Sequence, residues 1–125
     1  MIGFIMIGTN DLERSRKFYD IVLPTIGLSK IITTERYIGY GDKNKNENIE
    51  FYITRPFNKE KASYGNGTQI SFLVKSKLLV EKFYNTALKN GAIDEGEPGT
   101  RSELDYYAYF RDLDGNKICA YSKKI

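Results

Sequence analysis

The chain has 125 residues, of which 41% are apolar, with a net charge of +3, one cysteine and no histidine. These values are typical of one soluble globular domain and exclude a disordered chain or a framework of intramolecular disulfides. No apolar run is long enough to cross a membrane, no signal segment is visible, and the scattered lysines form no nucleic-acid-binding stripe. We therefore expect a cytoplasmic protein with neither membrane nor nucleic-acid partners. The mild positive charge favours an anionic ligand.

The first half of the chain predicts a strand, a helix and three further strands. Alternating apolar residues predict the strand at 2–8, and Asn10 with Glu13 predicts a capping box for a helix from about residue 11 to 23. Pro24 and Gly27 end this helix, and apolar runs at 28–33, 37–40 and 49–54 predict the three strands. The order is βαβββ.

The second half predicts the same order. A strand is expected at 68–74, Ser76 caps a helix to about residue 89, and strands follow at 93–96, 106–111 and 117–121. The acidic run 112–116 is expected to be a turn. It does not match a calcium-binding EF-hand loop, since the positions that need Gly and Glu hold Lys117 and Lys123.

A sequence repeat relates the two halves. Lys17, followed by Phe18-Tyr19 and Leu23, recurs 65 residues later as Lys82, followed by Phe83-Tyr84 and Leu88. The segment between the halves, 56–64, is short and charged rather than a flexible linker. We therefore expect one domain over residues 1–125, with module one at about 1–55 and module two at about 66–125. Whether loops 42–48 and 56–64 close over a ligand is left open.

Period-two alternation sorts the strand residues into two faces. An aliphatic face is expected to pack under the helices: Ile5, Ile7, Ile49, Phe51, Ile53, Ile70, Phe72, Val74, Ala108, Phe110, Ile118 and Ala120. The other face mixes aromatic and polar residues: Phe4, Met6, Glu50, Tyr52, Thr54, Gln69, Ser71, Tyr107, Tyr109, Lys117, Cys119 and Tyr121. Such a mixture is a poor dry core and a good pocket lining, so we expect it to bind a ligand.

Several motifs in this order resemble the vicinal oxygen chelate superfamily, which includes glyoxalase I, bleomycin-resistance proteins and extradiol dioxygenases. They are residues 3–8, 10–15, Phe18-Tyr19 with Leu23, 65–68 and 111–118. The resemblance spans essentially the whole chain. It implies an α+β fold in which two βαβββ modules form a curved, barrel-like mixed sheet with a ligand groove. It also implies a homodimer and, in the enzymes of the family, a divalent metal on the groove face.

The metal-ligand positions of those enzymes, mapped onto this chain, fall on Phe4, Glu50, Gln69 and Cys119. Phe4 has no ligating atom and a neutral Gln69 amide is a weak ligand, so three firm protein ligands are lacking. We therefore expect neither a metal nor another cofactor.

Each candidate site residue has an ordinary structural alternative. Glu50 is either a general base or an ion-pair partner for Lys117 or an arginine. Cys119 is either a nucleophile or, as we favour, a small buried residue, because no histidine can activate it. Arg101 is either a carboxylate- or phosphate-binding residue ahead of the Tyr106-Tyr107 strand, as in relatives, or simply solvated. The same applies to Arg55 and Arg111. The aromatic candidates, which either stack on a ligand or are ordinary strand residues, are Phe4, Tyr52, Tyr107, Tyr109 and Tyr121.

The leading hypothesis is a metal-independent protein of the glyoxalase and bleomycin-resistance type that binds a small aromatic or anionic ligand. The alternative is a glyoxalase-like lyase or isomerase, or a dioxygenase-type enzyme, with an unusual metal set or with Glu50 as general base. A dimeric scaffold with a vestigial groove is the third hypothesis.

Overall fold

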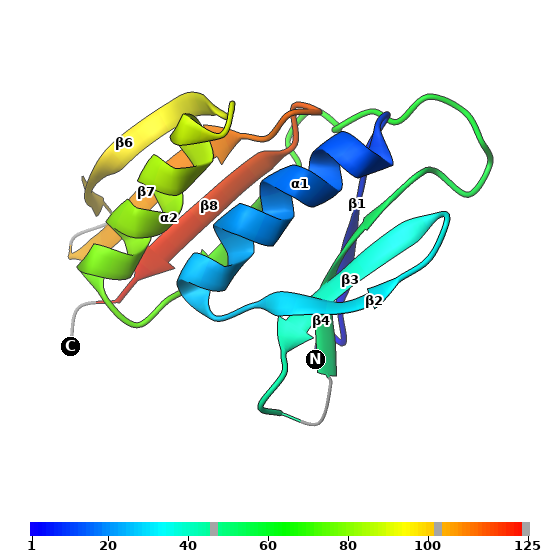
Figure 1. Cartoon of the computed structure of the whole chain (residues 1–125). Coiled ribbons are helices and arrows are strands. Elements are labelled where there is room, and N and C mark those ends of the chain that lie inside the picture. The colour runs from blue at the N-terminus through cyan, green and yellow to red at the C-terminus, as the bar shows by residue number, and fades with distance from the viewer. Residues whose placement is uncertain (46–47, 102–103, 124–125) are drawn as a thin grey trace. The chain divides into compact units, whose positions relative to one another are not determined.

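The computed structural model describes residues 1–45, 48–101 and 104–123, and these residues form an α+β fold of two βαβββ modules (Figure 1). The chain divides into two compact units, unit 1 over Met1–Tyr64 and unit 2 over Gly65–Ile125. Each unit holds its own four-stranded mixed sheet, and the boundary lies close to the module boundary that the repeat predicts. The barrel-like joining of the sheets stays a prediction.

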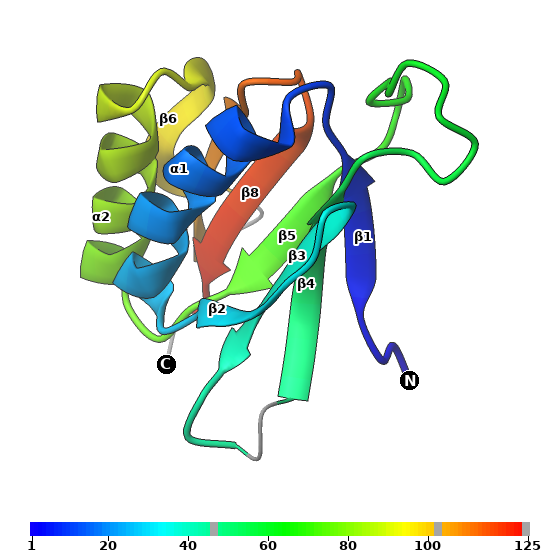
Figure 2. The same cartoon turned by 45° about the vertical axis from the view of Figure 1, so that its right-hand side comes forward.

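Unit 1 is built around a sheet with the strand order β1-β4-β3-β2, in which β1 and β4 are parallel and the other pairs antiparallel. Its elements are β1 (Ile5–Gly8), α1 (Leu12–Val22), the 3-10 helix η1 (Leu23–Ile26), β2 (Ser29–Thr33), β3 (Tyr37–Asp42) and β4 (Asn48–Thr54). All five predicted elements are present. The loop after β4 extends beyond the end of β1 (Figure 2).

Helix α1 packs on this sheet through aromatic side chains. The Tyr19 ring lies 5.2 Å from the Phe51 ring, and the fully buried Tyr40 donates a hydrogen bond of 2.9 Å to Asp20 on the helix. The predicted helix cap is wrong by one residue. Asp11, not Asn10, caps α1 by accepting from the Arg14 N–H, while Asn10 instead binds the backbone of Ala62 in both directions.

A β-bulge in β4 changes the predicted faces of unit 1. Tyr40 pairs with Phe51 and Gly41 pairs with Ile49, so Glu50 is an extra residue opposite no partner. The Ile49 side chain consequently lies beside Gly39 and Tyr52, on the face opposite to Phe51. The expectation that Ile49 shares the helix-covered face with Phe51 is wrong, because period-two alternation holds only where the strand is regular.

Unit 2 repeats the pattern with the strand order β5-β8-β7-β6. Its elements are β5 (Ile70–Leu73), α2 (Lys77–Lys89), β6 (Ile93–Arg101), β7 (Asp105–Arg111) and β8 (Lys117–Ser122). Ser76 caps α2 as predicted. The helix lies across the sheet (Figure 1), with Val80, Phe83 and Ala87 packed onto a core that includes Phe110, Ile118 and Ala120. Strand β6 is longer than predicted because two pairing irregularities let its glycines continue the ladder.

Residues 112–116 form the predicted turn. The buried Asp112 carboxylate accepts hydrogen bonds from the N–H groups of Asp114 and Asn116. Among the described residues, no helix is both long enough and apolar enough to cross a membrane.

Candidate functional site

Three stacked tyrosines cover the side of the unit 2 sheet that faces away from α2. Tyr107 and Tyr109 are two residues apart on β7, so both point away from the side that Ala108 and Phe110 bury. Tyr121 on β8 pairs directly with Tyr107. The Tyr107 ring is parallel to both neighbours, 6.0 Å from Tyr109 with an interplanar angle of 1° and 5.1 Å from Tyr121 with an angle of 9°. We call these three residues the tyrosine face.

Two cationic side chains lie over the ring at one end of the tyrosine face. The Arg101 guanidinium carbon is 5.5 Å from the centre of the Tyr109 ring, and the Lys117 Nζ is 5.2 Å from it. Both distances are within the range of cation–π attraction. Neither cation forms an ion pair with another residue that the structure describes. The face therefore combines a stack of aromatic rings with two charges that no described carboxylate neutralises.

Backbone carbonyls hold the Arg101 guanidinium in place. Its Nη1 donates to the carbonyl oxygens of Tyr107 at 2.7 Å and Gly99 at 3.4 Å, and its Nη2 donates to that of Glu97 at 2.6 Å. Of the five N–H groups, Nε–H and one on Nη2 have no acceptor among the described residues. Arg101 is thus oriented and still charged, with donors left for an anion.

Gly96 makes room for this arrangement. A Cβ atom at this position would lie 2.8 Å from the Tyr109 Cδ2 and 3.6 Å from the Arg101 Nη2. Only a residue without a side chain lets the Tyr109 ring and the guanidinium lie against β6 here.

Cys119 lies under the tyrosine face, opposite Tyr109 in the β7–β8 ladder, and is fully buried. Burial raises the pKa of its thiol, which the Ser71 hydrogen bond and the nearby Lys117 and Arg101 charges offset only in part. Burial likewise raises the pKa of the Tyr109 phenol. Both groups are therefore neutral at physiological pH. This chemistry agrees with a packed thiol and disfavours a nucleophile, because the thiolate is the reactive form.

The predicted site residues of unit 1 form a second aromatic group. Phe4 lies just before β1 and meets the Tyr52 ring edge-on at 5.0 Å, and Tyr37 meets Tyr52 from the other strand at 5.5 Å. Glu50 is exposed at the bulge and bonds to no described side chain. Tyr37 was not among the predicted site residues. The signal that points to it is its position two residues before Gly39, on the face of Tyr52.

The strand registers change the mapping of the family's metal positions. Ile5 pairs with Phe51 in unit 1, and the equivalent Ile70 pairs with Ile118 in unit 2. Glu50 and Cys119 are therefore not equivalent positions, since the residue equivalent to Cys119 is Tyr52 and the residue equivalent to Glu50 is Lys117. Within the described part of the chain, no three His, Cys, Asp or Glu side chains gather into a group that could hold a metal.

The side chains at these positions also do not fit a divalent metal chemically. Phe4 offers only carbon, the Gln69 amide nitrogen donates to the Ser71 hydroxyl at 2.9 Å, and Cys119 keeps its proton. Tyr52 is a phenol and not a carboxylate. A catalytic site of this kind needs three firm ligands within one coordination sphere.

The comparisons with known proteins agree with this fold. The model of the Glyoxalase/Bleomycin resistance protein/Dioxygenase superfamily matches residues 1–120, and the chain belongs to this superfamily. A glyoxalase/bleomycin resistance protein from Albidiferax ferrireducens T118 is similar in structure, with a TM-score of 0.89 and 37% sequence identity over 99% of both chains.

More distant structures share the fold alone. A lactoylglutathione lyase from Agrobacterium tumefaciens has a TM-score of 0.69 and 16% identity over 98% of this chain and 92% of its own. The fosfomycin resistance protein FosX from Mesorhizobium loti has a TM-score of 0.70 and 16% identity over 100% and 93%. None of the curated proteins matches the chain significantly.

Proposed function

We propose that this protein binds a small organic anion with an aromatic ring on the tyrosine face, without a metal. One observation carries the proposal: the parallel rings of Tyr107, Tyr109 and Tyr121 are flanked by Arg101 and Lys117, whose charges no described carboxylate neutralises. The planar ring of a ligand packs against this stack, at one end or against the ring edges, and aromatic pairs contribute about 0.5–1.5 kcal/mol beyond the area that they bury.

The two cations select for a negative group at the edge of the ring. The Nε–H and Nη2–H groups of Arg101 suit a carboxylate or phosphate, and the carbonyls that hold Arg101 reduce the entropy lost when it binds. Lys117 adds charge from β8. A ligand with only one of the two features, a ring or a charge, should bind more weakly than a ligand with both.

Metal independence rests on donor chemistry. Phe4, Tyr52, Gln69 and Cys119 supply no carboxylate and no imidazole, and Glu50 would add a single carboxylate. Glu50, the carboxylate that the alternative enzymatic hypothesis needs as a general base, is exposed and makes no contact that would position it toward a substrate. Glu50→Gln is accordingly expected to leave ligand binding unchanged. Turnover that this substitution abolishes would support the enzyme instead.

The direct test is a calorimetric titration of the protein with 1-naphthoate. The neutral 1-naphthalenemethanol is the control ligand. Tyr109→Leu should weaken naphthoate binding about two- to tenfold, the effect of one lost aromatic contact. Tyr106→Leu is the matched control variant, because Tyr106 is the next residue on the same strand but bonds to Glu81 on the helix side. Lys117→Gln should weaken naphthoate and leave the neutral alcohol unaffected.

Two outcomes would refute the proposal. The first is the absence of measurable naphthoate binding at millimolar concentration, which would favour a scaffold with no ligand. The second is an equal loss of affinity in the Tyr109 and Tyr106 variants. Metal analysis of the purified protein tests the proposal that the ligand binds without a metal, since stoichiometric bound zinc, nickel, manganese or iron contradicts it.

We also propose that the two units form one domain, that the protein is a homodimer, and that it resides in the cytoplasm. Large apolar side chains exposed in unit 1, including Phe4 and Met6, support association. The unpaired, buried Cys119 suits a reducing compartment. Analytical ultracentrifugation tests the dimer, and a monomer at micromolar concentration contradicts it.

A further inference from the structure

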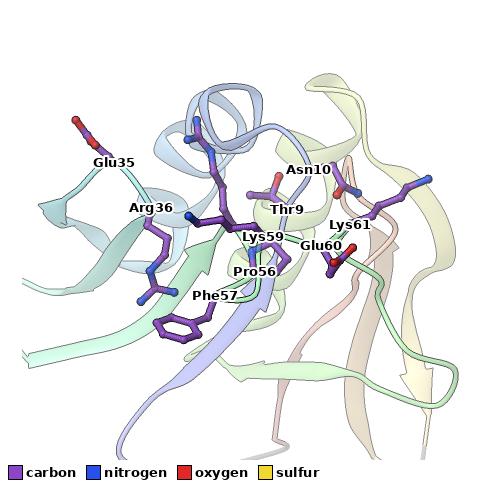
Figure 3. A pocket seen from close by; sticks show the side chains of 10 residues that line it. Thr9, Asn10, Glu35, Arg36, Pro56, Phe57, Lys59, Glu60 and Lys61 are labelled. Carbon is purple, nitrogen blue, oxygen red and sulfur yellow. The ribbon is translucent and has the colours of Figure 1, made fainter.

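Unit 1 contains a pocket of about 520 Å³ at the end of β1 that is separate from the tyrosine face (Figure 3). Its walls are the residues after β1, the turn before β3 and the loop 55–61. The volume lies within the range of small-molecule sites, about 300–1,000 Å³. All of its lining residues belong to unit 1.

Defined contacts hold the loop that forms the outer wall. The Asn10 side chain accepts from the Ala62 N–H at 2.8 Å and donates to the Ala62 carbonyl at 3.2 Å. The β1 backbone lies so close that a Cβ at Gly8 would be 3.0 Å from the Ala62 Cβ. The Lys59 N–H bonds to the Pro56 carbonyl at 3.0 Å and turns the chain between them. The pocket is thus shaped by hydrogen bonds and packing.

Arg36 lies close to two aromatic rings at this pocket. Its guanidinium carbon lies 5.1 Å from the centre of the Tyr37 ring and 5.4 Å from that of Phe57, and Nη1 donates to the Thr54 hydroxyl at 3.3 Å. Figure 3 shows Phe57 beside Arg36. Among the described residues, only the Thr54 hydroxyl accepts a hydrogen bond from the guanidinium, so N–H groups remain for an anion.

The pocket carries an excess of positive charge. Four of its lining side chains are cationic and two are carboxylates, and none of the six forms an ion pair with a described residue. Arg55 and Lys59 join Arg36 as cations, whereas the Lys61 amine points away from Arg36 in Figure 3. Unneutralised cations in a concave surface attract an anion.

We infer that this pocket binds the phosphate or carboxylate group of a small molecule, whose apolar part lies against Phe57. Arg36, Arg55 and Lys59 contact the anion, and the exposed Phe57 ring supplies the apolar surface. The residues that line this pocket and those of the tyrosine face do not overlap.

The test is a titration of the full chain with phenyl phosphate, monitored by ¹H–¹⁵N NMR. Parallel titrations use benzoate and inorganic phosphate. Phenyl phosphate is expected to shift the amide signals of residues 9–10 and 55–62 in a saturable way. Stronger binding of phenyl phosphate than of benzoate identifies a phosphate site, and the reverse order identifies a carboxylate site. Inorganic phosphate should bind more weakly than phenyl phosphate, because it has no group to contact Phe57.

Variants separate this pocket from general electrostatic attraction. Arg55→Gln should raise the dissociation constant of phenyl phosphate about five- to tenfold, as expected when one charge-assisted contact is lost. Lys43→Gln removes the same charge from an exposed turn that does not line the pocket and should change the constant less than twofold. Phe57→Ala should weaken phenyl phosphate but not inorganic phosphate.

Equal effects of the Arg55 and Lys43 variants would overturn the inference, and so would shifts confined to residues 101–121. Tyr109→Leu distinguishes the two sites, since it weakens naphthoate on the tyrosine face and should leave the shifts of residues 55–62 intact. Absence of naphthoate binding to the unaltered protein therefore refutes only the proposed function, and absence of the loop shifts with phenyl phosphate refutes only this inference.

Discussion

A pair of glycine substitutions on β6 tests the packing of the tyrosine face. Gly96 and Gly99 both pair with tyrosines of β7, and neither adopts a left-handed backbone conformation. A Cβ at Gly96 would lie 2.8 Å from the Tyr109 ring, whereas at Gly99 the nearest atoms are 3.9 Å away, in ordinary contact. Gly96→Ala should therefore displace the ring, and Gly99→Ala should not.

The expected magnitudes follow from two opposing effects. Replacing Gly by Ala stabilises a compatible site by about 0.4–1 kcal/mol, because it restricts the unfolded chain. Overpacking costs about 1–3 kcal/mol in a core, and the lower half of that range applies to the half-buried Tyr109. We expect Gly99→Ala to be neutral or stabilising and Gly96→Ala to be less stable than it by about 1–2 kcal/mol, which corresponds to roughly 4 °C of melting temperature per kcal/mol.

Thermal and urea unfolding measure the difference, and near-ultraviolet circular dichroism reports the tyrosine environment, because the chain contains no tryptophan to mask it. Gly96→Ala should alter this signal and weaken naphthoate binding, while Gly99→Ala preserves both. Two glycine variants with the same stability and the same affinity would refute the close packing of Tyr109 against β6.

Three further predictions concern individual contacts. Tyr40→Phe should lower the free energy of unfolding by about 1–3 kcal/mol, because the buried Tyr40 hydroxyl donates to the Asp20 carboxylate. A double-mutant cycle with Asp20→Ala should show coupling, and additive losses would contradict the contact. Ser76→Ala should lower the free energy of urea unfolding by about 1 kcal/mol, because α2 loses its N-cap. Ser63→Ala, in an exposed loop, is the control that should leave this free energy unchanged. The raised pKa of Cys119 means that the folded state holds its proton to higher pH than the unfolded state, so stability should fall above about pH 8.5. In urea unfolding at successive pH values, the free energy of unfolding of Cys119→Ala should fall less steeply with rising pH. A pH dependence equal to that of the unaltered protein would contradict the burial of the thiol.

The repeat made the element order predictable from sequence. Residues 65 positions apart, such as Ile5 and Ile70, occupy equivalent register positions in the two sheets. The alternation of Tyr107 and Tyr109 with Ala108 and Phe110 likewise placed both tyrosines on one face. These features depend on local pattern, which the sequence contains directly.

Features that depend on distant contacts could not be read in this way. Asn10 and Asp11 both suit a helix cap, and the contact of Asn10 with Ala62, 52 residues away, decides between them. Two of the three carbonyls that hold Arg101 belong to β6, whose path two pairing irregularities determine. Glu50 was wrongly matched with Cys119 because the parallel register of β1 with β4, and of β5 with β8, depends on pairing between strands far apart in the sequence.

The extra residue at the β4 bulge, Glu50, affects how this strand tolerates changes in length. Ile49 and Phe51 already point to opposite sides of the sheet, with Glu50 looped out between them. Deletion of Glu50 alone would join Ile49 directly to Phe51, and their side chains would then alternate as in a regular strand. No neighbouring side chain would have to move to the other face of the sheet. A one-residue deletion at this point should therefore be nearly silent, whereas the same deletion at Tyr52 would move Ile49 and Phe51 to the wrong sides.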